Sequence, residues 1–337
     1  MQQNLKVAVI GLGQMGTHHA RIYQKIPLVE LAAICEFNDT RRQEAKAEFG
    51  CTAFKDYREL LADASIDAVS IVLPDNMHRD CVEEAIKNKK HILLEKPLAK
   101  DLADGEAMYK ALQNYEKVFT VGFLLRFDPR FAMVKHALDN GTLGDIIHIN
   151  SRRNSPIIGP RRYIGASDLS MHVMIHDIDY INWYMNCKAV KVFAKARSVL
   201  LKEHNMQDVI YALVSYENGA IACLEACWVL PENSPTIIDD KMELVGTKGV
   251  AYIDSCDQGV KIVSSDRIEY PDSRHWPYVN GVPAGDLFEE LTAFINNILT
   301  GAKSIITARQ ALDSLKVVDA IERSIAEEKE VQLVSSK

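Results

Sequence analysis

Two histidines spaced four residues apart are candidates for proton transfer. Helical periodicity over residues 170–184 places His172 and His176 one turn apart on the same face of a helix. An imidazole with its reference pKa of about 6.5 can accept a hydroxyl proton at neutral pH, so His176 is the candidate general base. The spacing would also suit zinc, but no HExxH pattern or third ligand accompanies it, so we expect no metal. Either histidine could instead pack against or cap the helix, and this alternative is stronger for His172.

A glycine-rich turn near the N-terminus is the second candidate. An apolar run is followed by Gly11-Leu12-Gly13-Gln14-Met15-Gly16 and then by a helical pattern. In a strand, turn and helix of this kind, Gly11 permits the sharp turn and Gly13 lets a pyrophosphate approach the backbone. Gly16 lets the helix pack closely on the strand. The turn, including Gln14 and Met15, is predicted to bind a dinucleotide. The alternative is a glycine turn that only joins two elements.

The carboxylate of Glu36 indicates which dinucleotide the turn binds. It ends the apolar run 29–35, about twenty residues past the last glycine, where the fingerprint places a carboxylate on the ribose hydroxyls. A carboxylate there would repel a 2′-phosphate, so NAD is favoured over NADP. Arg41 and Arg42 follow and could bind that phosphate, which keeps NADP as the less favoured alternative.

Lys96 lies on the corner Glu95-Lys96-Pro97, just past an apolar strand. With a nicotinamide cofactor at this edge, the Lys96 ammonium would stabilise the alkoxide-like oxygen that develops as a hydride leaves carbon. Pro97 biases Lys96 away from helix and so directs its side chain. The alternative is a solvated lysine at a strand end.

The elements that must position these groups form two domains. Over residues 5–122, apolar strands alternate with amphipathic helices as in βαβ units, which predicts a parallel sheet covered on both faces. Ligand chemistry gathers at the carboxyl ends of such strands. The residues expected at this edge, around the cofactor, are Pro74, Asn76, His78, Glu95 and Lys96.

The second half of the chain shows a different pattern of predicted elements. Five or six strands succeed one another between residues 190 and 268, which indicates an antiparallel sheet, and helices at 287–299 and 308–328 close the chain. We therefore divide the chain into a dinucleotide-binding domain, residues 1–123, and a substrate-binding domain, residues 124–337.

Composition excludes several function classes. A formal charge of −7 argues against nucleic-acid binding, which usually needs a basic excess. No apolar run reaches the roughly eighteen residues of a membrane span, and the first four residues leave no room for a signal peptide. A cytoplasmic protein is expected. Seven scattered cysteines without a CxxC pair predict free thiols.

Taken together, the motifs resemble the glucose-fructose oxidoreductase and inositol dehydrogenase family (Gfo/Idh/MocA). The matching stretches, in order, are the glycine turn, Glu95-Lys96-Pro97, Gly122-Phe123, Arg126-Phe127-Asp128-Pro129 and His176-Asp177-Ile178-Asp179. The resemblance implies an α/β protein, a Rossmann domain followed by a domain with an open, mostly antiparallel sheet that commonly serves dimer contacts. A homodimer or homotetramer is therefore expected. The resemblance also implies oxidation of a sugar or cyclitol hydroxyl with Lys96 and His176 as catalytic residues, and Arg126 beside the cofactor.

One departure from the family concerns His172. Many members carry an aspartate four residues before the base, and this chain has His172 there. Either His172 takes over the contact to the substrate hydroxyl, or Asp168 or Asp179 reaches it, or the activity is altered.

The substrate is suggested by an arginine-rich loop. Residues 151–163 hold four arginines, of which Arg152, Arg161 and Arg162 are candidates for binding an anionic substrate; a solvated charged loop is the alternative. The loop is similar to that of family members that oxidise the 3-hydroxyl of UDP-N-acetylglucosamine. Residues 274–278 could also contact a sugar, or form a structural crossover.

The predicted function is thus NAD-dependent hydride transfer between nicotinamide and a hydroxyl carbon of a sugar, sugar nucleotide or cyclitol. A non-enzymatic sensor of dinucleotide or sugar is the alternative, since Rossmann folds host many functions. The presence of both Lys96 and His176 argues against it, because a sensor does not need a proton-handling pair.

Overall fold

The computed structural model describes residues 4–162, 164–165, 167–256 and 259–333. The chain forms two compact units, Met1–Leu124 with Arg274–Leu312, and Leu125–Ser273 with Asp313–Lys337. The sequence-based division placed everything after residue 123 in one domain. In the structure, the segment Arg274–Leu312 returns to the first unit.

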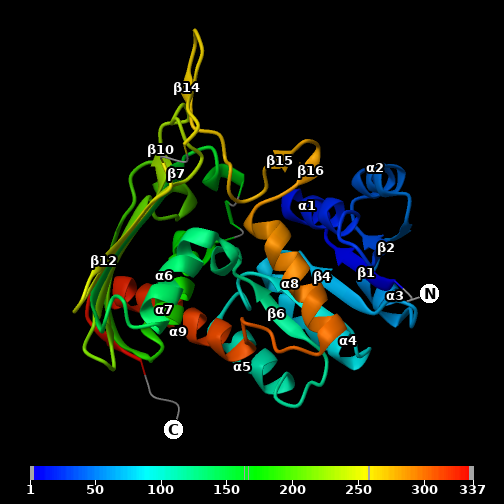
Figure 1. Ribbon diagram of the computed structural model, residues 1–337, viewed down its shortest axis with the longest axis horizontal. Coiled ribbons are helices and arrows are strands. Elements are labelled where there is room, and N and C mark those ends of the chain that lie inside the picture. The colour runs from blue at the N-terminus through cyan, green and yellow to red at the C-terminus, as the bar shows by residue number, and fades with distance from the viewer. Residues whose placement is uncertain (1–3, 163, 166, 257–258, 334–337) are drawn as a thin grey trace. The chain divides into compact units, whose positions relative to one another are not determined.

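The first unit is built on a six-stranded parallel sheet (Figure 1). Its strand order is β3-β2-β1-β4-β5-β6, the doubly wound order of dinucleotide-binding domains, so the predicted Rossmann sheet is confirmed. The strands are β1 Leu5–Ile10, β2 Val29–Cys35, β3 Thr52–Phe54, β4 Ala68–Ile71, β5 His91–Glu95 and β6 Phe119–Gly122. The helices are α1 Gln14–Tyr23, α2 Asp39–Phe49, α3 Tyr57–Ala62, α4 His78–Lys87, α5 Leu102–Ala111 and α8 Asp286–Thr300, with the short η1 Asp75–Met77. A small hairpin, β15 Tyr278–Val279 and β16 Val282–Pro283, precedes α8.

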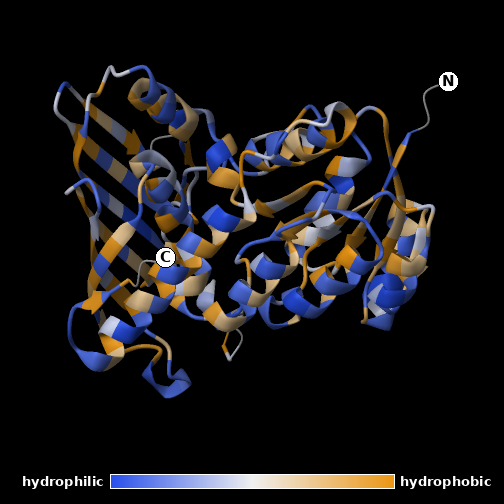
Figure 2. Ribbon diagram, turned by 90° about the horizontal axis from the view of Figure 1, so that it is seen from below, coloured by the Kyte–Doolittle hydropathy of each residue, from blue (hydrophilic) through white to orange (hydrophobic). Residues whose placement is uncertain are grey.

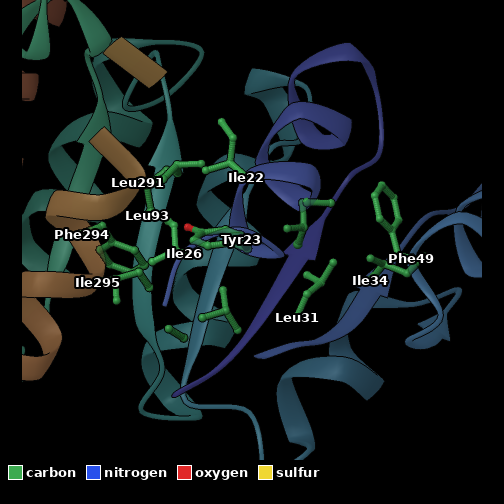
Figure 3. Close-up of a cluster of buried hydrophobic side chains, with 14 of the residues drawn as sticks. Ile22, Tyr23, Ile26, Leu31, Ile34, Phe49, Leu93, Leu291, Phe294 and Ile295 are labelled. Atoms are coloured by element: carbon green, nitrogen blue, oxygen red, sulfur yellow. The ribbon is translucent and has the colours of Figure 1, made fainter. Parts of the chain in front are cut away.

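Helix α8 completes the core of this unit although it comes from the far end of the chain. Figure 3 shows Leu291 and Phe294 of α8 in one cluster with Tyr23 of α1 and Leu93 of β5, and all four side chains are buried. Burying a side chain of this size contributes about 1.5–3 kcal/mol. This packing explains why the segment that carries α8 belongs to the first unit.

The second unit is an open seven-stranded sheet in the order β12-β11-β7-β10-β9-β8-β17. In the described part of this sheet the pair β7 and β10 is parallel and the other pairs are antiparallel, which confirms the predicted mostly antiparallel sheet. The strands are β7 Ile146–Pro156, β8 Ala189–Arg197, β9 Val209–Tyr216, β10 Ile221–Leu230, β11 Asp239–Gly246, β12 Val250–Asp254 and β17 Val331–Gln332. A separate hairpin, β13 Ile262–Val263 and β14 Ile268–Glu269, projects beyond the sheet (Figure 1).

Helices cover one face of this sheet and leave the other exposed. The helices α6 Pro129–Asp139 and α7 Ile175–Met185 lie on the covered face, together with the part of α9 Ala308–Glu327 that belongs to this unit (Figure 1). Side chains alternate along β9, where Ile210 and Ala212 are buried and Tyr211 and Leu213 are exposed. The alternation appears in Figure 2 as bands across the strands. The short helices η2 Leu124–Phe127, η3 Pro160–Arg162 and η5 Lys202–His204 lie in the connections.

The helix predicted over residues 170–184 has two parts. A π-helical stretch, Ser170–Met174, precedes α7. Its wider turn differs from the regular helix that places residues i and i+4 on one face, and such stretches occur frequently at functional sites. His172 lies in the π-helical part and His176 in the first turn of α7.

Candidate cofactor and catalytic site

The glycine turn between β1 and α1 is open toward a ligand at one glycine and closed at the other two. Gly11 has φ +92°, and a Cβ there would lie 2.3 Å from the Val72 carbonyl oxygen. A Cβ on Gly16 would lie 1.9 Å from the Gly11 carbonyl oxygen. A Cβ on Gly13 would meet no atom of the described residues within 4 Å, and φ at Gly13 is an ordinary −68°. The fold therefore requires Gly11 and Gly16, while Gly13 leaves space in front of the turn.

The N-terminus of α1 fits an anion in that space. Gly13 is the N-cap residue of α1. Because glycine has no side chain, this N-cap makes no side-chain hydrogen bond to the first amides of the helix. Gln14 is exposed at the first helical position, and Met15 packs toward the core. Amide groups at an uncapped helix start favour a phosphate, so the turn suits a dinucleotide pyrophosphate.

Glu36 lies beside the turn and is oriented by backbone amides. Its Oε2 accepts a hydrogen bond from the Leu12 amide at 3.0 Å, and its Oε1 accepts one from the Asn38 amide at 2.8 Å. Arg41 donates to the same Oε1 at 3.2 Å, and Arg42 donates to the Glu36 carbonyl oxygen at 3.0 Å. Both arginines that could have bound a 2′-phosphate therefore already contact Glu36, which fits NAD.

Lys96 is half-buried at the carboxyl end of β5, on a corner whose Lys96-Pro97 peptide is cis. Glu95 was predicted to contact the cofactor. In the structure its carboxylate is buried, 3.1 Å from His19 Nε2 and 3.1 Å from the Lys96 amide. His78, predicted at the same edge, is buried with its ring nitrogens 2.9 Å from the carbonyl oxygens of Pro97 and Leu73. Glu95 and His78 thus bind the chain itself.

Two other residues predicted at this edge are accessible. Pro74 and Asn76 are exposed at η1, directly after β4. Since β4 and β5 are adjacent parallel strands, these residues and Lys96 lie at the same sheet edge. This arrangement puts Pro74, Asn76 and Lys96 at the sheet edge where the cofactor is expected.

In the second unit, His172 and His176 are partly exposed on a segment whose other side chains are mostly buried. The His172 ring lies 6.5 Å from that of Trp228, measured between centroids. Asp177 is buried; its Oδ1 accepts from the Ser151 hydroxyl and its Oδ2 from Arg153 Nε, each at 2.6 Å. The segment therefore presents its histidines and is anchored by its aspartates.

Asp179 and Arg126 form a second anchor. Arg126 Nε and Nη2 each donate to one oxygen of Asp179 at 2.8 Å, and both side chains are only 1% exposed. Burial raises the pKa of Asp179, whereas the adjacent guanidinium opposes that rise and favours the carboxylate. The sequence assigned Arg126 to the cofactor and Asp179 to the substrate. The geometry pairs them with each other, so neither assignment gains support.

The arginines predicted to bind an anion are also paired. Arg152 donates to Asp239 at 2.6 Å and Arg161 to Glu232 at 2.5 Å, while the side chain of Arg162 lies outside the described part. These pairs give Arg152 and Arg161 carboxylate partners. In the first unit, the segment predicted to contact a sugar buries Arg274 and His275 beside Asp286, with His275 Nδ1 2.8 Å from Asp286 Oδ2. This favours a structural crossover.

Sequence reasoning missed His19 altogether. A histidine on the apolar face of a helix gives no signal that distinguishes it from a core residue, and its partner Glu95 is 76 residues away. Among the residues that the structure describes, no group of three or more His, Cys, Asp or Glu side chains could hold a metal ion. Nor does any helix in the described ranges have the length and apolar character to cross a membrane.

Comparison with known proteins identifies the class that this fold and site define. Residues 5–123 match the oxidoreductase family with an NAD-binding Rossmann fold, and residues 131–252 match the GFO/IDH/MocA C-terminal domain. The chain belongs to the Gfo/Idh/MocA family. It is an NAD-dependent oxidoreductase acting on CH–OH groups.

Several relatives are similar over their full length. The chain is 30% identical to a myo-inositol 2-dehydrogenase from Thermotoga maritima, with 98% of each chain covered. It is 27% identical to the NAD(+)-dependent scyllo-inositol 2-dehydrogenase of Bacillus subtilis, covering 99% of this chain and 97% of the relative. Its structure is similar to that of scyllo-inositol dehydrogenase from Lactobacillus casei with bound NAD(H) and scyllo-inositol. That match has a TM-score of 0.85 and 26% identity, and covers 99% of this chain and 100% of the relative. The narrower UDP-N-acetylglucosamine interpretation gains no support from these relatives.

Proposed function

We propose that this protein is a cyclitol dehydrogenase that oxidises a ring hydroxyl of an inositol with NAD. The observation that carries the proposal is the full-length likeness to the enzyme whose structure holds both NAD(H) and scyllo-inositol. The carboxylate partners of Arg152 and Arg161 support an uncharged polyol over an anion as the substrate.

In the proposed reaction, His176 accepts the hydroxyl proton, and the Lys96 ammonium stabilises the negative charge that develops on the oxygen. Glu36 would hold the adenosine ribose hydroxyls of the cofactor, and the Gly13 edge of the turn would hold its pyrophosphate. Bound NAD would supply the hydride acceptor. His172 contacts a second substrate hydroxyl where many family members have aspartate.

The test monitors NADH formation by its absorbance. The candidate substrates are scyllo-inositol, myo-inositol, glucose, a hexuronate and UDP-N-acetylglucosamine. Turnover is expected with a cyclitol, and turnover confined to another substrate would refute the proposal.

Lys96→Met should lower kcat by about 10²–10³-fold while NADH binding is retained. Lys100→Met is the matched control, because Lys100 is an exposed lysine four residues away that pairs with Asp101 and Asp104.

The exposed face of the second unit's sheet supports association of copies of this chain. Phe193 of β8 is the register partner of Leu213 of β9, which in turn faces Cys223 of β10. Tyr211 and Ile221 are also exposed on these strands. Contiguous exposed apolar side chains mark interaction sites. We expect light scattering to give the molar mass of a homodimer or homotetramer. Leu213→Glu should lower that mass toward the mass of a monomer, and an unchanged mass would reject this interface.

A further inference from the structure

Two buried histidines flank the corner that carries Lys96. His19 comes from α1 and His78 from the start of α4, and each is 0% exposed. Both bind the residues on either side of Lys96. Neither histidine has a role in the proposed chemistry, so their placement calls for another explanation.

His19 reaches the Lys96 backbone through Glu95. The His19 Nε2 lies 3.1 Å from Glu95 Oε1, and Glu95 Oε2 accepts the Lys96 amide hydrogen at 3.1 Å. The other ring nitrogen of His19, Nδ1, has no hydrogen-bond partner among the residues that the structure describes. A ring hydrogen on Nδ1 would thus be unsatisfied, and a hydrogen on Nε2 donates to the carboxylate.

Space on the far side of Glu95 is closed. A Cβ on Gly122, the register partner of Glu95 in β6, would lie 3.2 Å from Glu95 Oε1. The carboxylate therefore packs closely against Gly122 of β6 on one side and against His19 of α1 on the other, and a side chain at position 122 would crowd it. A carboxylate buried this closely needs its hydrogen bonds, so removal of His19 would not be compensated by solvent.

His78 holds the following residue of the corner. Its Nδ1 lies 2.9 Å from the Pro97 carbonyl oxygen and its Nε2 2.9 Å from the Leu73 carbonyl oxygen. Burial lowers the pKa of His78. The hydrogen bonds to the two carbonyl oxygens act in the opposite direction but are the smaller effect. The ring thus bridges the segments that follow two adjacent strands, β4 and β5.

We propose that His19 is a positioning residue for Lys96, which acts through the Glu95 carboxylate and fixes the backbone from which the catalytic ammonium projects. The chain of contacts runs from α1, whose N-terminus faces the pyrophosphate space, to the amide of Lys96. His78 restrains the same corner from its other side. The role of Lys96 in turnover rests on the proposed function, whereas the contact itself does not.

The experiment compares His19→Gln, whose side-chain amide can still donate to Glu95, with His19→Leu, which cannot. Hydrogen exchange at the Lys96 amide is measured by mass spectrometry with fragmentation, and kcat and the KM for NAD are measured with the best cyclitol substrate. His18→Leu is the matched control on the same helix, since His18 stacks on Trp276 with ring centroids 5.5 Å apart.

In His19→Leu, Lys96 amide exchange should accelerate and kcat should fall, each by about tenfold or more, with little change in KM for NAD. His19→Gln should restore both, and His18→Leu should change neither. A primary deuterium isotope effect on kcat that rises in His19→Leu would show that the hydride step has slowed. A purely structural role would lower thermal stability and leave the isotope effect and kcat unchanged.

Other results would overturn the proposal. If the Lys96 amide in His19→Leu exchanges at the wild-type rate, the positioning role of His19 is rejected, whether or not any cyclitol is oxidised. Failure of this proposal can therefore be distinguished from failure of the proposed function. If His19→Leu does not fold, Glu95→Gln decides, because His19 and the Lys96 amide bind different oxygens of Glu95, and a Gln side chain has an accepting oxygen at only one of those two positions. Unchanged exchange in that variant would equally reject the coupling.

Discussion

Glycine at position 13 is expected to be required for ligand binding and not for folding. Its φ of −68° suits any residue, and a Cβ there meets no described atom within 4 Å. Replacing glycine by alanine at such an angle stabilises by about 0.4–1 kcal/mol through the unfolded chain. Alanine is a poorer N-cap by a comparable amount. Gly13→Ala should therefore change the free energy of unfolding by less than about 1 kcal/mol.

The same methyl group would occupy the space through which a pyrophosphate approaches α1. Loss of one charge-assisted hydrogen bond costs about 1.5–3 kcal/mol, which corresponds to roughly 10–100-fold weaker NAD binding. The assay is titration with NADH by calorimetry, alongside denaturant unfolding without nucleotide. Gly16→Ala is the control, since its Cβ would lie 1.9 Å from the Gly11 carbonyl oxygen and should destabilise the fold itself. Wild-type NADH affinity in Gly13→Ala, or unfolding as easy as that of Gly16→Ala, would refute the reasoning.

Three further changes test other parts of the account. Glu36→Ser should reduce the preference for NAD over NADP by at least about tenfold in kcat/KM, because it removes the carboxylate that repels a 2′-phosphate; an unchanged ratio would contradict this. Asp179→Asn removes the negative charge that is paired with the buried Arg126 guanidinium and should cost about 3–5 kcal/mol in denaturant unfolding, and a loss below about 1 kcal/mol would count against the anchor. Burial lowers the pKa of His91 to about 4, below its unfolded value, so its stabilising contribution is complete above about pH 6.5 and is lost as pH falls toward 4. His91→Asn, whose amide oxygen can accept the Val118 amide hydrogen that His91 accepts at 3.0 Å, should lose that dependence, measured as unfolding free energy against pH.

Local patterns located the elements well because apolar periodicity reports which face of an element is buried. The run 29–35 became β2 over the same residues, and the helix expected at 287–299 is α8, Asp286–Thr300. Periodicity does not report the partner of a buried face. The amphipathic pattern of α8 is the same whether it packs on neighbouring strands or, as here, with Tyr23 and Leu93 of the distant N-terminal core.

The same limit applies to the site. The glycine turn and Glu36 were predictable because a dinucleotide-binding βαβ unit fixes their spacing, with the carboxylate after the second strand and 24 residues beyond Leu12. Asp179 was expected at the substrate because its motif lies next to His176, but its partner Arg126 is 53 residues away and only the folded chain brings them together. The catalytic roles of Lys96 and His176 stay predictions until turnover is measured.

The most direct test of hydride transfer from a cyclitol is the fate of carbon-bound deuterium. The protein is incubated with NAD and scyllo-inositol deuterated at every ring carbon, and the NADH formed is analysed by mass spectrometry and NMR. The account predicts one deuterium in each NADH, located at C4 of the nicotinamide. NADH free of deuterium, or no NADH from any inositol, would contradict it.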